Sequence, residues 1–130
     1  MDALARMIAL EKEARQFGFD WPHPQMILDQ AVDECREIRE EIEQGSDKKK
    51  LQEEIGDLLH AAVSLCVFCG FKVEETLDKT NTKFAGRLGL LKQLASSHGL
   101  ADLQGQTLDF MLKLWKQVKQ MEKEAPLATL

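Results

Sequence analysis

Apolar residues recur at helical spacing, three or four positions apart, along five segments of the chain. No segment alternates apolar and polar residues with the period of two that marks a half-buried strand, and no Asn-Gly or Asp-Gly hairpin turn occurs. The pattern predicts an all-α fold with helices over residues 3–16, 25–44, 47–69, 73–95 and 108–123.

Glycines and prolines predict where these helices end. Gly18, Gly45 and Gly70 follow the first three segments, and glycine is common just after a helix. Ser46 or Asp47 can cap the third helix. Residues 19–24 form a rigid connector, because its two prolines disfavour helix before them, and residues 98–105 form a loop.

The short connections among the second, third and fourth helices favour antiparallel neighbours, and hence a bundle of about five helices. Two glycines at 86 and 89 weaken the helical pattern in the middle of the fourth segment. Apolar residues of the third helix spread over more than one face, so we expect the bundle to be completed by self-association into at least a homodimer. Leu65, Val67 and Phe68 are candidates for that interface.

Composition is that of a single domain spanning residues 1–130, with 44% hydrophobic and 30% charged residues. The net charge of −5 argues against nucleic acid as a partner, because backbone binding requires a basic surface. Asp2, Glu11 and Glu13 interrupt any signal peptide. The apolar stretch 61–71 is about half of the ~20 residues that a membrane span needs.

Three cysteines, at 35, 66 and 69, form no disulfide framework and indicate a reducing, cytoplasmic setting. Cys66 and Cys69 have the spacing of zinc ligands, but no second pair of ligands completes such a site. Their apolar neighbours predict buried structural thiols instead.

Two acidic pairs are the strongest chemical signal in the chain. Glu34 and Glu37, like Glu54 and Asp57, are three residues apart, so each pair leaves its helix on one side. On a helical wheel Glu34 lies at the edge of the apolar stripe, whereas Asp57 lies furthest from the stripe on its own helix.

A carboxylate at the edge of a core must find a cation or take up a proton. Four carboxylates from two adjacent antiparallel helices would form an oxygen-rich site for a divalent metal. The alternative is a pair of solvated surfaces, which is the usual place of acidic pairs on helices. Glu41 is a further candidate ligand or base, although we expect a surface role for it.

At this point the residues resemble a known family, the MazG-type nucleotide pyrophosphohydrolases of the all-α NTP pyrophosphatase group. The family signature E-x-x-E followed by E-x-x-D is represented by Glu34, Glu37, Glu54 and Asp57. The resemblance extends from about residue 18 to residue 119, through the segments Phe19-Asp20-Trp21-Pro22, Leu51 to Leu59, Asn81-Thr82-Lys83-Phe84 with Arg87, and Leu114 to Lys119.

The resemblance implies Mg²⁺-dependent hydrolysis of a nucleoside triphosphate to the monophosphate and pyrophosphate, as a house-cleaning reaction or a control of nucleotide pools. It implies that the four acids are catalytic and hold Mg²⁺, with Mn²⁺ as a substitute. It further implies contacts with the substrate from Asn81, Lys83, Arg87, Trp115 and Lys119.

The chain departs from the family pattern in three places. Asp33 stands where the family often has glutamate, and Gly86, Arg87 and Leu88 stand where it often has two arginines and a phenylalanine. One phosphate-directed cation is therefore missing, which bears on substrate preference. Many relatives also carry two such domains in tandem, whereas this sequence holds one.

Two other functions are compatible with the pattern. Asp57 and His60 have the E-x-x-H spacing of di-iron bundles, but no second such pair lies on a helix. His60 is therefore expected to be a structural residue with a partner. A catalytically inactive helical interaction module would show the same amphipathic helices and no stabilisation by magnesium.

Overall fold

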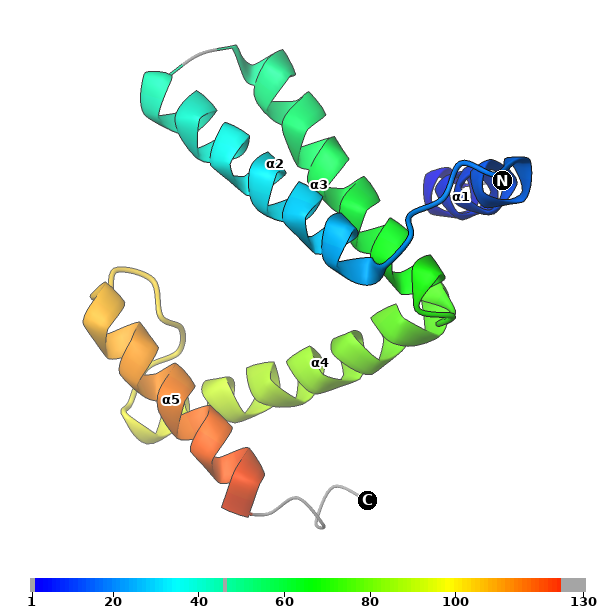
Figure 1. Cartoon of the computed structure of the whole chain (residues 1–130). Coiled ribbons are helices and arrows are strands. Elements are labelled where there is room, and N and C mark those ends of the chain that lie inside the picture. The colour runs from blue at the N-terminus through cyan, green and yellow to red at the C-terminus, as the bar shows by residue number, and fades with distance from the viewer. Residues whose placement is uncertain (1, 46, 125–130) are drawn as a thin grey trace. The chain divides into compact units, whose positions relative to one another are not determined.

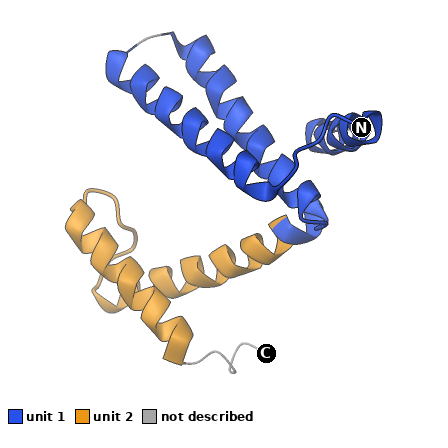
Figure 2. Cartoon of the chain, in the orientation of Figure 1, with its two compact units in different colours: residues 1–76 blue, residues 77–130 orange. Residues whose placement is uncertain are grey.

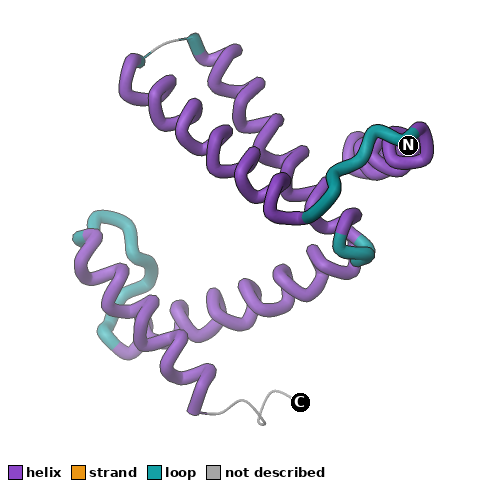
Figure 3. Tube along the Cα trace, viewed as in Figure 1, coloured by secondary structure: helices purple, strands orange, loops and turns teal. Residues whose placement is uncertain are grey.

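The computed structural model describes residues 2–45 and 47–124. Over these residues it contains five helices and no strand (Figures 1 and 3). The helices are α1 Ala3–Phe17, α2 Pro24–Gln44, α3 Lys48–Phe68, α4 Val73–Ser97 and α5 Leu108–Glu124. The all-α prediction is confirmed, and every predicted boundary lies within two residues of the observed one.

The helix ends have the physical causes that the sequence indicates. Asp2 caps α1 by accepting a hydrogen bond from the backbone N of Ala5. Gly18 and Gly45 end α1 and α2 in the left-handed conformation, with φ of 102° and 64°. Asp47 caps α3 by accepting from Lys49 N at 3.0 Å, whereas Ser46 lies outside the described residues.

The chain divides into two compact units, residues 1–76 and residues 77–130 (Figure 2). In the first unit α2 and α3 form an antiparallel hairpin, and α1 packs against α3. Ile27, Ala61, Val63 and Val73 are its buried apolar residues. The hairpin is the element that positions both acidic pairs.

The second unit contains most of α4 together with α5, and its buried apolar residues are Ala95, Leu114 and Val118. Helix α4 is continuous through Gly86 and Gly89, so the two glycines do not interrupt it. Ring contacts join its helices: Phe84 meets Trp115 edge to face, with ring centroids 6.4 Å apart.

The prediction of buried thiols is wrong for Cys69, which follows the last turn of α3 and is exposed. Cys66 is partly buried, with its Sγ 3.4 Å from Thr76 Oγ1. No single helix within the described ranges is long and apolar enough to cross a membrane, and only α3 and α4 taken together across the break between them meet that test.

Candidate functional site

An ion pair sets the register of the α2–α3 hairpin. Lys50 Nζ lies 3.4 Å from Glu41 Oε2. Both residues lie within one helical turn of the connection between the two helices. Because the helices are antiparallel, each step back along α2 matches a step forward along α3. The residues four positions from this pair are Glu37 and Glu54, and those seven positions away are Glu34 and Asp57.

Glu41 itself corrects the sequence prediction. The prediction of a surface role is wrong, because the residue is only 6% exposed and forms an ion pair with Lys50. A helical wheel treats each helix alone, so it does not show that α3 covers this position. Glu41 thus lies in the same row of α2 residues as Glu34 and Glu37, at the end nearest the connection.

The pKa values show that the four predicted acids share one electrostatic environment. Burial first, and then the charges of Glu37 and Asp57, raise the pKa of Glu34. Burial first, and then the charge of Glu41, raise the pKa of Glu54, with an opposing effect of Lys50. The two acidic pairs therefore interact across the hairpin, as proximity of α2 and α3 predicts.

One carboxylate oxygen of Glu34 and one of Glu54 are buried without any hydrogen-bond partner. Such oxygens are costly unless a donor or a cation satisfies them. Glu37 and Asp57 are exposed beside them. The four side chains thus combine acceptors that lack a partner with acceptors that are accessible from solvent.

This donor set fits a divalent metal, because hard cations such as Mg²⁺ and Ca²⁺ take carboxylate oxygens. Among the described residues, no three or more Asp, Glu, His or Cys side chains are already arranged to hold a metal ion. Ligation of a cation by these four side chains would therefore require them to adopt other rotamers. The orphaned oxygens of Glu34 and Glu54 identify the groups that gain most from it.

A cleft of about 810 Å³ lies beside the carboxylates in the first unit. Its walls come from one face of α1, from the connector residues Phe19 to Trp21, and from α2 and α3. Glu34 and Asp57 line it, so the cleft and the acidic site are continuous. The sequence prediction included neither the cleft nor the α1 residues.

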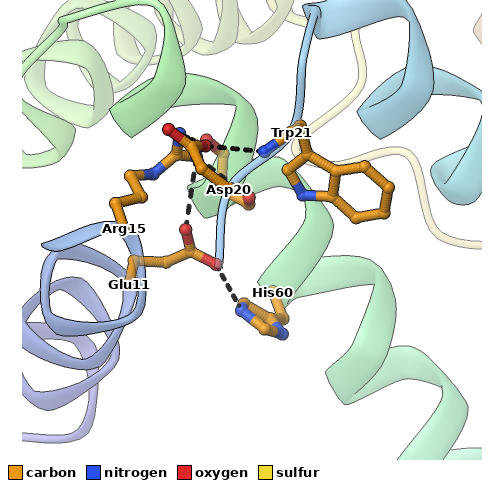
Figure 4. A network of polar contacts seen from close by, with 6 residues as sticks. Glu11, Arg15, Asp20, Trp21 and His60 are labelled. Atoms are coloured by element: carbon orange, nitrogen blue, oxygen red, sulfur yellow. Dashed lines mark hydrogen bonds and ion pairs between the residues drawn. The ribbon is translucent and has the colours of Figure 1, made fainter. Parts of the chain in front are cut away.

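Arg15 is the centre of a polar network that joins these walls (Figure 4). Its guanidinium donates to Asp20 Oδ1 in the connector at 2.5 Å and to the backbone O of Ser64 on α3 at 3.0 Å. It also pairs with Glu11 at 3.3 Å. These contacts hold α1 and the connector against α3.

His60 has the partner that was expected of it. Its Nε2 lies 2.7 Å from Glu11 Oε1 (Figure 4). A carboxylate only accepts, so Nε2 carries the hydrogen and donates it. Glu11 is thereby shared between Arg15 and His60. No local sequence signal points to these contacts, because His60 and Glu11 are 49 positions apart.

The five predicted substrate-binding residues belong to the second unit. The ring centroid of Trp115 lies 5.8 Å from the guanidinium carbon of Arg87 and 6.0 Å from Lys119 Nζ, so these three side chains are close together. Arg87 Nε also donates to Glu122 Oε1 at 2.9 Å. Asn81 and Lys83 are exposed on α4. The structure describes the two units separately, so a meeting of these residues with the acidic site stays a prediction.

Comparison with protein families identifies a matching domain. Residues 23–88 match the family model of the MazG nucleotide pyrophosphohydrolase domain. This range contains α2, α3 and all four acids, and it continues through the boundary between the two units into α4.

Individual relatives agree with the family match. The chain is 36% identical over 123 residues to a nucleoside triphosphate pyrophosphohydrolase of Escherichia coli K12, covering 94% of this chain and 46% of the relative. It is 30% identical over 117 residues to the nucleoside triphosphate pyrophosphohydrolase/pyrophosphatase MazG of Thermotoga maritima, covering 90% and 44%. The chain thus spans less than half the length of these relatives.

Proposed function

Because this chain belongs to the MazG nucleotide pyrophosphohydrolase family, we propose that it hydrolyses a nucleoside triphosphate to the monophosphate and pyrophosphate. One observation carries the proposal: two carboxylates with partnerless buried oxygens face two more acids across the α2–α3 hairpin, inside the segment that matches the family. An uncompensated acidic site would repel a triphosphate, so the substrate has to arrive with divalent cations.

Glu34, Glu37, Glu54 and Asp57 would hold the divalent ion, with Mg²⁺ preferred and Mn²⁺ as a substitute. When bound, such an ion supplies positive charge for the triphosphate and a Lewis acid that makes water more acidic. The exposed carboxylates of Glu37 and Asp57 face solvent, where they can orient an attacking water. Glu34 and Glu54 are the more buried anchors.

The cations of the second unit are proposed to bind phosphate oxygens. Lys83 and Arg87 are one turn apart on α4, and Lys119 projects from α5 beside Trp115. Arg87 would have to exchange Glu122 for phosphate, which makes it a more selective contact than Lys83. Asn81 adds a hydrogen-bonding group, and Trp115 an aromatic surface.

The decisive experiment compares the variants Glu37→Gln and Asp57→Asn with the original chain. We expect both to abolish magnesium-dependent release of pyrophosphate while leaving the helical circular dichroism spectrum intact. Glu40→Gln is the matched control, because Glu40 is an exposed acid on the same helix. Undiminished turnover in either site variant, or orthophosphate as the primary product, would contradict the proposal.

A catalytically inactive interaction module predicts a different result. Such a protein would show no rise of melting temperature with magnesium, whereas a ligand that binds only the folded state must stabilise it. Thermal melting with and without Mg²⁺ therefore separates the two functions even before a substrate is known.

Three further properties belong to the proposal. The three cysteines are free, which fits a reducing cytoplasmic compartment. The family match crosses from the first unit into the second, which supports one functional domain over residues 1–130. Apolar side chains left exposed on the hairpin support a homodimer.

A further inference from the structure

The cleft of the first unit has a wall whose chemistry differs from that of the acidic site. Helix α1 contributes residues spaced along a single face, where the apolar side chains of Met7 and Leu10 alternate with charged ones such as Arg6 and Glu11. The connector adds the aromatic rings of Phe19 and Trp21. Apolar and aromatic side chains offer neither ligands to a metal ion nor donors to phosphate.

Polar side chains come from every wall of this cleft. Helix α1 and the connector contribute Arg6, Glu11, Arg15 and Asp20, and the hairpin contributes Gln30, Glu34, Asp57, His60 and Ser64. Gln30 lies one turn before Glu34 on α2, and His60 lies one turn after Asp57 on α3, and all four line the cleft. The amide of Gln30 offers both a donor and an acceptor, the combination that the edge of a nucleobase requires. The cleft therefore has an acidic end at Glu34 and Asp57, and its other walls combine apolar side chains with hydrogen-bonding and charged groups.

We propose that this cleft is the nucleoside subsite, in which the base and sugar of the triphosphate lie between α1, Trp21 and Gln30. The inference rests on the proposed function, because Glu34 and Asp57 would hold the metal-bound phosphates at its acidic end. Its volume of about 810 Å³ falls within the range of about 300–1,000 Å³ that is usual for small-molecule sites. Aromatic and apolar walls with a few placed polar groups are also usual there.

The network around Arg15 keeps this subsite formed. Arg15 joins α1, the connector and α3 at once, and its guanidinium also lies 5.1 Å from the ring centroid of Phe68. Asp20 accepts from Arg15 and from the backbone N of Trp21, at 2.5 and 2.7 Å. The indole of Trp21 extends away from the guanidinium (Figure 4).

Trp115 was proposed for the same role as Trp21, an aromatic surface for the nucleotide. Fluorescence can distinguish the two tryptophans. The chain has two tryptophans. In Trp115→Phe the fluorescence comes from Trp21 alone, and in Trp21→Phe it comes from Trp115 alone. Each protein is titrated with the monophosphates of adenosine, guanosine, cytidine and uridine and with their deoxy forms, in the presence of Mg²⁺. These compounds are products of the proposed reaction, so no turnover disturbs the measurement.

We expect at least one nucleotide to change the emission of Trp21 in a saturable manner. Adding Gln30→Ala should weaken that binding by about three- to tenfold, the loss of one hydrogen bond. Gln25→Ala is the matched control, because Gln25 is an exposed glutamine on the same helix that does not line the cleft. It should leave the affinity unchanged.

If Trp115→Phe fails to fold, the indole N–H signal of Trp21 in the NMR spectrum of the unaltered chain gives the same readout. A Trp21 that responds to none of the eight nucleotides would overturn the subsite, whether or not Trp115 responds. Equal weakening by Gln30→Ala and Gln25→Ala would overturn it too. Because binding is measured without catalysis, a failure of the hydrolase proposal appears separately, as absent pyrophosphate release.

Discussion

Glu34 and Glu54 each hold one carboxylate oxygen in the protein without a hydrogen-bond donor, close to two further acids. This arrangement costs folding free energy, since burial and like charges both disfavour the ionised form. A buried oxygen that costs stability and has no hydrogen-bond donor is typical of a functional site rather than of a structural one. The raised pKa of both residues therefore leads to a measurable prediction.

Replacing Glu34 with glutamine should stabilise the metal-free protein and abolish its response to magnesium. The amide keeps the shape of the side chain but removes the charge that Glu37 and Asp57 repel. We expect a melting temperature about 2–4 °C higher than that of the original chain at pH 7.5 without metal. With Mg²⁺ the order should reverse, because only the original chain gains binding energy.

The pH dependence of this difference follows from the direction of the shift. The pKa of Glu34 is raised above 4.5 in the folded protein, so the folded state holds its proton to higher pH than the unfolded state. Its unfavourable contribution is absent below pH 4.5 and develops as pH rises through the folded pKa. The advantage of Glu34→Gln should therefore vanish in melts at or below pH 4.5. An advantage that persists at low pH would mean that charge is not its cause.

The site was predictable from sequence only as far as one helix at a time can show. The wheel identified Glu34 as the innermost acid of its pair, and its raised pKa with its buried oxygen agrees. It failed for Glu41, because burial there depends on α3 lying alongside. Glu11 and Arg15 were missed for a related reason: they contact residues 49 positions away, and no local periodicity reports such contacts.

At the scale of helices, glycines act in opposite ways according to their backbone conformation. Gly45 ends α2 with φ of 64°, a region that residues with a side chain rarely adopt. Gly89 lies inside α4 without positive φ, and a Cβ built there meets no atom within 4 Å. Interior glycine costs a helix about 0.5–1 kcal/mol relative to alanine.

The substitution Gly89→Ala should therefore raise the free energy of unfolding by about 0.5–1 kcal/mol. Gly45→Ala should lower it by about 1 kcal/mol, because the left-handed conformation disfavours a Cβ. Chemical denaturation followed by circular dichroism measures both changes. Destabilisation by Gly89→Ala would show that something outside the chain's own contacts occupies that side of α4.

Helix α1 should depend on Arg15 more than on its own apolar face, since its described residues include none that is fully buried. Arg15→Ala removes hydrogen bonds to Asp20 and Ser64, and we expect a loss of about 1–3 kcal/mol. The effect should be local. Amide hydrogen exchange should accelerate along α1 while α2 and α3 keep their protection.

Arg39→Ala is the control for this experiment, because Arg39 is an exposed arginine on α2. Unchanged protection of α1 in the Arg15 variant would mean that the connector alone holds the helix in place. Lysine at position 15 should restore little, because a single ammonium cannot reproduce the forked contacts of a guanidinium.

At the scale of the molecule, the helices were predictable because local spacing and end signals determine them, whereas the surfaces that meet one another were not. The hairpin illustrates the difference. Leu28 and Val32 on α2, and Ile55 and Leu59 on α3, are left exposed, and on a helical wheel each lies away from the acids of its own helix. Exposed apolar side chains on two packed helices are typical of an interaction site. Its position could not be obtained from either helix alone.

A second copy of the chain is the partner that we expect on this surface. Light scattering coupled to size-exclusion chromatography should give a mass near twice the 14.7 kDa of one chain. Leu59, at 62% exposure, is the best place for a disruptive charge. Leu59→Glu should shift the mass to that of a monomer, since an association surface tolerates a buried, unpaired carboxylate poorly.

Leu108→Glu, which places the same charge at an exposed leucine at the start of α5, should leave the mass unchanged. A monomeric original chain would contradict the homodimer. A Leu59→Glu protein that melts at lower temperature but keeps the doubled mass would show that the surface is covered within one chain. The dimer would then have to be built on another face, for which Leu65, Val67 and Phe68 are the remaining candidates.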